Sequence, residues 1–200
     1  MSGGGQSSGV VTIQRLVALE AERFAPQPLL AGVNRIFRAT AVRWPTDTAA
    51  SAAFQHLWLD QYLEHERDLV FVASRAQAGG GRDVVGYLLG CRINPARSPR
   101  FAALDYFQAF APLCARYPAH LHVNIDAGCR GQRIGERLVE VLCELLAFEG
   151  LAGVHVVTGR EQRNVGFYRR LGFDELGHVP RGATEVLFLG RRLARTAPRS

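Results

Sequence analysis

The chain has 200 residues, of which 48% are hydrophobic and 21% are charged. This length and apolar fraction are sufficient for one domain with a full core that needs no disulfides or structural metal. The sequence contains no lysine, so all 24 basic residues are arginine, and the formal net charge is +6. A Walker-type phosphate loop requires a lysine, so its absence excludes a nucleoside triphosphatase of that class.

The chain divides into a single domain and two short ends. Residues 1–9 are rich in glycine and serine and we expect them to be disordered, residues 10–193 to form the domain, and residues 194–200 to form a basic tail. The first nine residues lack the parts of a signal peptide, and no apolar run is long enough to span a membrane, which favours a cytoplasmic protein. The four cysteines are scattered without Cys-x-x-Cys spacing, so we expect neither a disulfide framework nor a bound metal.

The N-terminal part is predicted to begin with a strand and a helix. The strand covers residues 10–16, with a poor boundary to a helix over 15–24, and a better helix covers 50–66. The apolar stripe of this second helix consists of Phe54, Leu57, Trp58, Tyr62 and Leu63.

A hairpin and an aromatic segment follow. Residues 68–75 and 83–94 are predicted to pair around a turn at 78–82, where three glycines permit the positive φ of a tight reversal. Residues 98–117 contain five aromatic side chains and are predicted to be helical. An aromatic stripe is more often core than site, although this segment could line a ligand pocket.

Residues 120–150 have the pattern of a strand, a turn and a helix. Leu121, Val123 and Ile125 alternate with polar residues, which predicts a half-buried strand with a polar face. Apolar residues then recur at helical spacing until Gly150, which favours a helix end. They are Ile134, Leu138, Val141, Leu142 and Leu145. A turn between a strand and a helix N-terminus presents unpaired backbone N–H groups, which favours a phosphate site.

The turn itself reads Arg130-Gly131-Gln132-Arg133-Ile134-Gly135 and lacks the Gly-x-Gly-x-x-Gly spacing of a dinucleotide fold. It resembles the Gln/Arg-x-x-Gly-x-Gly/Ala signature of the GCN5-related N-acetyltransferases. Residues 153–157 are predicted as the next strand, and Phe167-Tyr168-Arg169-Arg170-Leu171-Gly172-Phe173 is similar to the second signature of that family. Two signatures in this order, about thirty residues apart, are far more specific than either alone.

The resemblance implies an α/β acetyltransferase fold, with a central, mixed and mostly antiparallel sheet flanked by helices. It implies acetyl-CoA as the cosubstrate and an amine as the acceptor. The implied cofactor contacts are the backbone around Ile125, the turn residues Arg130, Gly131, Gln132, Arg133, Ile134 and Gly135, and Asn164. The sequence departs from the family at Arg133, which replaces a glycine and either adds a phosphate contact or narrows the cradle. It also departs at Glu161, where the family often has asparagine.

Acetyl transfer to an amine needs a base, a donor to the carbonyl oxygen and an acid for the departing thiolate. Tyr168 matches a family tyrosine near the cofactor sulfur, and a phenol is protonated at neutral pH. His122 and Asp126, on the polar face of the predicted strand, are the candidate bases, because histidine titrates near neutrality. A histidine on a strand face is nevertheless more often a packed residue. Glu185 is a lesser candidate, and the sequence does not identify the base.

Two other functions stay open. A non-catalytic acyl-CoA-binding module would have the same fold, and residues 98–122 resemble the acetyltransferase-like module of some O-GlcNAc hydrolases, which can lack an obvious base. A nucleic-acid-binding protein would use the arginines of residues 191–200, but no basic stripe interleaved with aromatics supports it, so we do not expect nucleic acid. No motif identifies the acceptor as a small amine, antibiotic, peptide N-terminus or protein lysine, and a homodimer is open.

Overall fold

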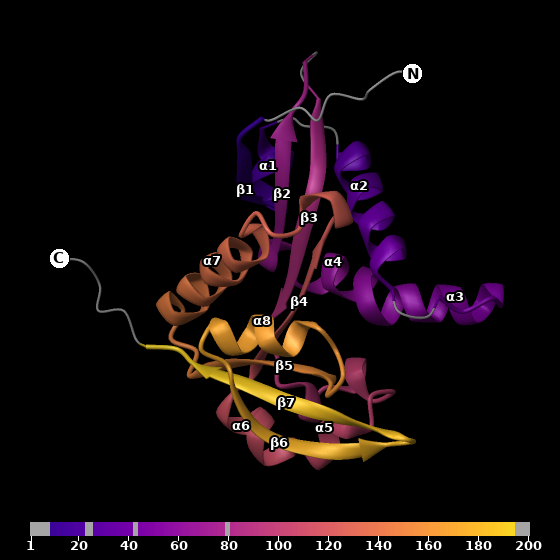
Figure 1. Ribbon diagram of the computed structural model, residues 1–200, viewed down its shortest axis with the longest axis vertical. Coiled ribbons are helices and arrows are strands. Elements are labelled where there is room, and N and C mark those ends of the chain that lie inside the picture. Colours follow the sequence, from indigo (N-terminus) through magenta and orange to yellow (C-terminus); the bar gives the residue numbers. More distant parts are fainter. Residues whose placement is uncertain (1–8, 23–25, 42–43, 79–80, 195–200) are drawn as a thin grey trace.

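A seven-stranded sheet runs through the molecule (Figure 1). The computed structural model describes residues 9–22, 26–41, 44–78 and 81–194. The strands are β1 (Val11–Arg15), β2 (Val70–Ala76), β3 (Arg82–Cys91), β4 (Ala119–Ile125), β5 (Gly153–Gly159), β6 (Asp174–Arg181) and β7 (Thr184–Arg192). They lie in the order β1-β2-β3-β4-β5-β7-β6, and every neighbouring pair is antiparallel except β4 and β5. The predicted α/β class with a mixed, mostly antiparallel sheet is confirmed.

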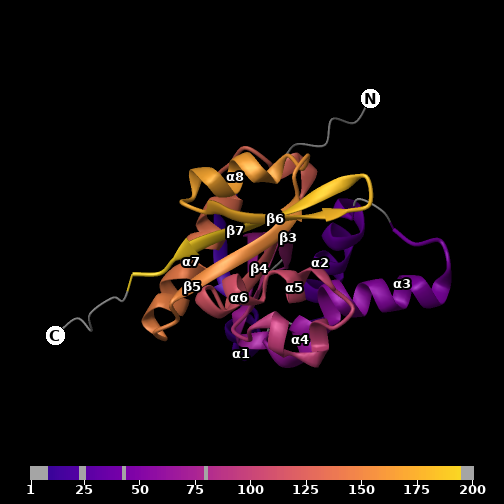
Figure 2. The ribbon, with the colours of Figure 1, turned by 90° about the horizontal axis from the view of Figure 1, so that it is seen from below.

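Helices cover both faces of this sheet. They are α1 (Leu16–Ala21), α2 (Pro26–Thr40), α3 (Thr48–Gln55), α4 (Gln61–His65), α5 (Tyr106–Ala109), α6 (Ala111–Arg116), α7 (Ile134–Phe148) and α8 (Asn164–Arg170). Helices α1, α2, α4, α5 and α6 contribute to one buried cluster, and α7 and α8 to a second. Figure 2 shows this layering, with α8 on one side of β5, β6 and β7 and with α5 and α6 on the other.

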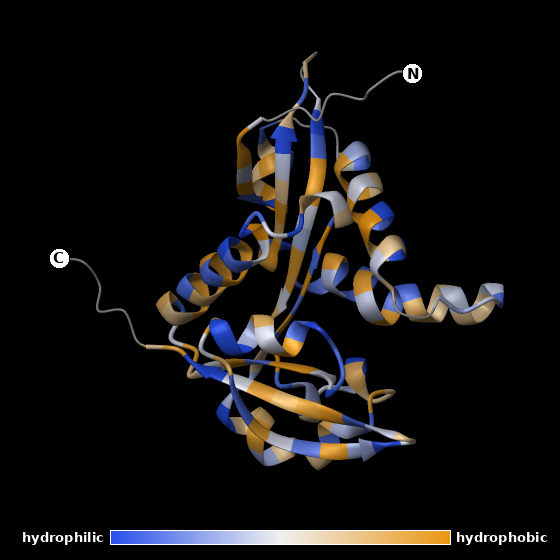
Figure 3. Ribbon diagram, in the orientation of Figure 1, coloured by the Kyte–Doolittle hydropathy of each residue, from blue (hydrophilic) through white to orange (hydrophobic). Residues whose placement is uncertain are grey.

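Helix α7 packs through the predicted apolar stripe. Its buried residues are Ile134, Leu138, Val139, Leu142, Cys143, Leu146 and Ala147. Figure 3 shows hydrophobic and hydrophilic residues alternating along this helix, as expected when one face is buried and the other solvated. One predicted member is wrong, because Val141 is 37% exposed. The stripe passes through Val139 and Cys143, and Val141 lies at its edge.

Two helical regions differ from the prediction. The helix predicted over 50–66 is divided into α3 and α4 by a π-helical turn, His56–Asp60. Such a turn inserts an extra residue and rotates the following side chains relative to the preceding ones. Helix α2 is absent from the predicted elements, although its buried residues recur at helical spacing. They are Leu29, Val33, Ile36 and Phe37.

The predicted helical segment 98–117 is confirmed as short helices, with α5 and α6 preceded by 3₁₀ turns at Pro95–Arg97 and Pro99–Phe101. The arginine-rich end over residues 191–200, which a nucleic-acid-binding protein would use, needs correction. Arg191 and Arg192 are not part of a tail but belong to strand β7. The guanidinium of Arg191 pairs with Glu140 at 2.7 and 3.0 Å. Three predicted features lie outside the described residues in whole or in part. They are residues 1–8 of the disordered start expected over 1–9, residues 195–200 of the basic tail, and the turn glycines at 79–80.

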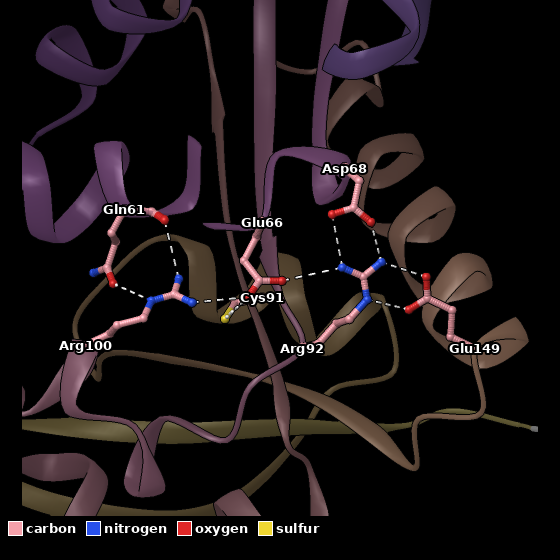
Figure 4. A network of polar contacts seen from close by, with 7 residues as sticks. All are labelled: Gln61, Glu66, Asp68, Cys91, Arg92, Arg100 and Glu149. Atoms are coloured by element: carbon pink, nitrogen blue, oxygen red, sulfur yellow. Dashed lines mark hydrogen bonds and ion pairs between the residues drawn. The ribbon is translucent and has the colours of Figure 1, made fainter. Parts of the chain in front are cut away.

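A polar network connects the ends of β3, α4 and α7 (Figure 4). Glu66 is 4% exposed. Its carboxylate forms ion pairs with Arg100 at 3.3 Å and with Arg92 at 3.5 Å. Arg92 also forms an ion pair with Glu149 at 2.7 Å. A buried carboxylate without cationic partners would be strongly destabilising, so the two arginines allow Glu66 to be buried. The network is structural, because none of its members lines the cavity described below.

Strands β4 and β5 separate soon after they meet. Their parallel pairing consists of Ala119 with Val154 and His120 with His155. Beyond these pairs β4 continues to Ile125 and β5 to Gly159. The hydrogen-bond ladder between β4 and β5 ends there, so the facing edges of the two strands no longer pair with each other. A gap therefore opens within the sheet.

Candidate functional site

A cavity of about 1320 Å³ lies where β4 and β5 separate. Its lining comes from both sides of the sheet and from the β6–β7 hairpin. One group of lining residues is Asn124, Ile125, Cys129, Arg130, Gly131, Arg133, Ile134 and Gly135 from β4 to α7, with Asn164, Phe167, Tyr168 and Arg170 from α8. The other group includes Phe37, Phe54, Trp58, Tyr106, His122, Val157, Arg181 and Val186. One continuous space therefore connects the two predicted signatures to an aromatic wall.

The turn before α7 is shaped by Asp126 and by two residues with positive φ. The Asp126 carboxylate accepts a hydrogen bond from the Gly128 N–H at 3.0 Å. Gly131 has φ of 78° and Arg133 has φ of 57°. The backbone N–H groups at the start of α7 have no partner within the helix, and the helix dipole adds partial positive charge there. Backbone from Gly131 to Gly135 can thus receive an anionic group.

Arg133 occupies a left-handed conformation, which costs a residue with a Cβ roughly 1–2 kcal/mol. The family signature has glycine at this position, and the observed φ explains why. The Arg133 side chain is 78% exposed and its guanidinium bonds to Glu136 at 2.5 and 2.8 Å. The side chain lies over the first turn of α7. An arginine therefore fits at the glycine position of the signature, at the cost of strain in the backbone.

The edge of β4 that faces the gap carries backbone groups that have no strand partner among the described residues. The Asp126 N–H donates to the Val85 carbonyl of β3 at 2.9 Å. Because backbone groups alternate along a strand, those of Val123 and Ile125 point to the opposite edge, toward β5. The β4–β5 ladder ends at His120, so the N–H and C=O groups of Val123 and Ile125 face the cavity. The contact predicted around Ile125 would use these backbone groups.

Gly135 lets α7 approach β4 and α8 closely. A Cβ there would lie 3.3 Å from Cζ of Phe167 and 3.5 Å from Cγ1 of Ile125. On the opposite side of the gap, the Thr158 hydroxyl donates to the Asn164 side chain at 2.9 Å. The two signatures are therefore in contact, and Asn164 is held at the start of α8 beside the cavity.

Tyr168 lies in the cavity wall with its ring in the core. It is 4% exposed, and its ring meets Phe167 at 5.0 Å and Phe173 at 5.4 Å. Burial raises the pKa of Tyr168 above its ordinary value, so the phenol is protonated at neutral pH. Within the described residues its hydroxyl has no protein hydrogen-bond partner, which leaves this donor available to a ligand.

His122 lines the cavity, and it lies within hydrogen-bond distance of the same hydroxyl as His120. The Tyr62 hydroxyl lies 3.0 Å from Nε2 of His122 and 3.2 Å from Nε2 of His120. Burial lowers the pKa of His122 to about 4, so the ring is neutral at pH 7. The predicted polar face of β4 is therefore wrong in one respect: it lies against α4 and the aromatic core, with His120 only 3% exposed.

Other predicted residues lie apart from the cavity lining. The Asp126 carboxylate is 2.5 Å from Arg35, which lowers its pKa together with the Gly128 hydrogen bond. Gln132 accepts a hydrogen bond from Arg75 at 2.8 Å. Glu185 pairs with Arg160 at 2.5 Å. None of the three predicted residues lines the cavity, so the structure brings together His122, Tyr168 and most of the turn without them.

Sequence reasoning did not assign Phe37, Phe54 and Trp58 to the site, whereas it expected that the segment with Tyr106 could line a ligand pocket. Phe54 and Trp58 stand on the predicted apolar stripe of residues 50–66, and Tyr106 stands in the aromatic segment. The sequence signal was the number of aromatic residues in these segments, which exceeds what a single helix face can bury. Phe54 and Trp58 are only partly buried and both line the cavity.

A family model described as the acetyltransferase (GNAT) family matches residues 33–173. Solved structures also share the fold. The crystal structure of SsHAT is 27% identical over 92% of this chain and 98% of its own, with a TM-score of 0.67. Ard1 from Thermoplasma volcanium is 16% identical over 92% and 97%, with a TM-score of 0.60.

The NatC complex bound to Gag peptide and CoA contains a chain that is 14% identical, covers 92% of this chain and 99% of its own, and has a TM-score of 0.62. At such identity the likeness concerns the fold alone. No helix among the described residues combines the length and apolarity needed to cross a membrane.

Proposed function

Because the chain belongs to the acetyltransferase (GNAT) family, we propose that it is an acetyl-CoA-dependent N-acetyltransferase that acetylates a primary amine by direct attack. The proposal rests on one observation. The same cavity joins the turn before α7, the free edge of β4 and the aromatic wall. Two substrates in one cavity can react without a covalent enzyme intermediate. All four cysteines are free, which fits a reducing cytoplasm.

The residues present fit acetyl-CoA. Backbone N–H groups from Gly131 to Gly135 suit the pyrophosphate, and Arg130 and Arg170 add positive charge to the same lining. The edge of β4 at Val123 and Ile125 offers hydrogen bonds to an extended amide-bearing arm. When bound, acetyl-CoA supplies the activated acyl group and a thiolate leaving group. Gly131 and the left-handed Arg133 keep the N–H groups directed toward that anion.

Tyr168 is the proposed acid. Tyr168 lines the cavity, and its hydroxyl has its proton at neutral pH because burial raises the pKa of the phenol. A donor held near a sulfur that gains negative charge stabilises that charge. The ring contacts with Phe167 and Phe173 fix the direction of the phenol, so little reorganisation is needed.

His122 is the proposed base. The single hydrogen of the Tyr62 hydroxyl can be donated to only one of its two histidine neighbours, so it must accept from the other. If it is donated to His120, then His122 donates from Nε2 and its Nδ1 keeps a lone pair. A neutral imidazole in the cavity wall can accept the proton that the amine nitrogen loses as it forms the new bond.

Calorimetric titration with acetyl-CoA, CoA and ATP tests the cofactor half of the proposal. We expect binding of acetyl-CoA and CoA and much weaker binding of ATP, because ATP lacks the arm that pairs with β4. Release of CoA that depends on an added amine tests the other half. Binding without amine-dependent release would favour a non-catalytic acyl-CoA-binding module.

A further inference from the structure

The aromatic half of the cavity carries a further inference, which rests on the proposed function. We propose that the acceptor is a primary amine on an aromatic or other flat apolar body that carries no second positive charge. The arrangement of rings, the charges in the lining and the position of Arg181 support this substrate class.

Aromatic rings form a continuous wall from α2 to His122. Phe37 and Phe54 stack with centroids 5.8 Å apart and planes at 26°. Phe54 lies 6.3 Å from Trp58, and Trp58 meets the His122 ring edge-on at 5.2 Å. All four rings line the cavity, and Phe54 and Trp58 are only partly buried. A flat apolar body laid along this wall would bring its amine to His122.

The charges in the lining disfavour a second ammonium group. The arginines that line the cavity are Arg130, Arg133, Arg163, Arg170 and Arg181. Glu136 is the one acidic residue of the described lining, and both its oxygens bond to Arg133, at 2.5 and 2.8 Å. A second ammonium beside the aromatic wall would lose water without gaining a carboxylate partner, and Arg181 would repel it. Polyamines and aminoglycosides are therefore poor acceptors.

A monoamine is suited to this lining because its apolar body contributes the binding free energy and its amine needs no carboxylate partner once it is neutral. Only the neutral amine can attack a carbonyl, so the lining favours the form that reacts.

Arg181 closes the part of the cavity formed by α5 and the β6–β7 hairpin. Its guanidinium carbon lies 5.1 Å from the centroid of Tyr106. Arg181 is exposed at the end of β6 and lines the cavity together with Tyr106. At this position it repels a cation but can donate hydrogen bonds to a neutral or acidic substituent. The arrangement therefore tolerates a polar end on the acceptor while rejecting a diamine.

An amine panel tests the inference at matched concentrations. The probes are 2-phenylethylamine and tryptamine as aromatic monoamines, butylamine as a small aliphatic monoamine, and spermidine and kanamycin as polycations. Amine-dependent CoA release gives kcat/KM, and calorimetric titration with each amine gives binding without turnover. We expect the aromatic monoamines to exceed butylamine by about 10-fold in kcat/KM and spermidine by more. Equal or better use of spermidine or kanamycin would overturn the inference.

Two variants sharpen the test. Trp58→Ala should raise KM for 2-phenylethylamine about 10-fold and leave acetyl-CoA affinity unchanged, because it removes one ring of the wall. Phe148→Ala is the matched control, since Phe148 is 76% exposed at the end of α7 and does not line the cavity. Arg181→Glu should improve the use of spermidine relative to 2-phenylethylamine. An unchanged preference in both cavity variants would contradict the inference.

These readouts separate the inference from the proposed function. Calorimetric binding of aromatic amines that is weakened in Trp58→Ala supports the acceptor class even if no amine is acetylated, in which case the proposed function fails. Efficient acetylation of polycations supports the proposed function and overturns the acceptor class.

Discussion

The Tyr62 hydroxyl lies 3.0 Å from Nε2 of His122 and thereby links the cavity wall to the buried core. Tyr62 is 1% exposed and also lies 3.2 Å from Nε2 of His120. A single hydroxyl proton shared between two imidazoles requires one of them to donate from Nε2 and the other to accept there. The proposed base therefore depends on a residue that does not line the cavity.

Tyr62→Phe should lower kcat about 10-fold or more with little change in acetyl-CoA affinity, because His122 loses the partner that fixes its protonated nitrogen. It should also destabilise the protein by about 1–3 kcal/mol, since two buried imidazoles lose a hydrogen bond. Nitrogen NMR of the histidine side chains should show opposite tautomers for His120 and His122 in the unaltered protein. The same tautomer in both rings would contradict the assignment. Tyr117→Phe, in the same core, serves as the control.

Tyr168→Phe should reduce kcat by about 100-fold while the dissociation constant for acetyl-CoA changes little, as expected for an acid that acts only as the thiolate leaves. The ring contacts survive the substitution, so the free energy of unfolding should stay nearly the same. Steady-state kinetics and calorimetry on one preparation check both quantities. A parallel loss of kcat and affinity would make Tyr168 a binding residue.

Arg130→Glu should weaken acetyl-CoA binding by about 10-fold or more at low salt, because it places a carboxylate at the helix N-terminus that receives the pyrophosphate. The effect should shrink as salt is added, since exposed charges are screened. Arg97→Glu offers the same charge reversal at an exposed position outside the cavity lining. Equal affinities for the two variants would refute the placement of the phosphate site.

Substitutions at Arg133 distinguish backbone strain from phosphate contact. Arg133→Gly should be more stable than Arg133→Val by about 1–2 kcal/mol, because φ of 57° is strained for a residue with a Cβ and most strained for a β-branched one. Since the guanidinium bonds to Glu136, acetyl-CoA affinity should change little in Arg133→Gly. Chemical denaturation and calorimetry provide the two numbers. A large loss of affinity in the glycine variant would show that the side chain holds the cofactor.

Acid should destabilise the protein before its carboxylates titrate. Burial lowers the pKa of His155 and of His122 to about 4. Above pH 6.5 these rings are neutral in both folded and unfolded chains. Between pH 6.5 and 4 the unfolded chain binds protons that the folded one does not, so the free energy of unfolding falls by up to about 1.4 kcal/mol per pH unit and histidine. His155 is fully buried and should dominate together with His120, whose pKa is also lowered by burial, whereas His122 is partly exposed.

Urea unfolding at several pH values between 7 and 4.5 measures this slope. His155→Gln should flatten it, and His65→Gln, at an exposed position, should not. If His155→Gln fails to fold, the histidine NMR signals of the unaltered protein decide the matter, because His155 should not titrate above pH 5. A titration near pH 6.5 would contradict the burial argument.

The sequence predicts the part of the site that is local in the chain. The turn from Arg130 to Gly135 and the helix that follows depend on residues close to one another, and both appear where expected. Tyr168 likewise follows from a motif of seven residues. The narrower resemblance to the O-GlcNAc hydrolase modules stays a prediction.

What could not be predicted depends on contacts between distant segments. Asp126 is paired by Arg35, which is 91 residues away in the chain, so its position on the strand gave no sign that its carboxylate was engaged. Tyr62 reaches His122 from 60 residues away. The π-helical turn before Tyr62 changes which side chains of that helix face the core, and no local pattern marks it.

Transfer of a labelled acetyl group tests the central claim most directly. The protein would be incubated with isotopically labelled acetyl-CoA and each amine of the panel, and the products analysed by mass spectrometry. We predict the label in an amide of at least one monoamine, formed only in the presence of the protein and at a strongly reduced rate in Tyr168→Phe. Binding of acetyl-CoA with no labelled amide from any amine would contradict the claim that this chain is an N-acetyltransferase.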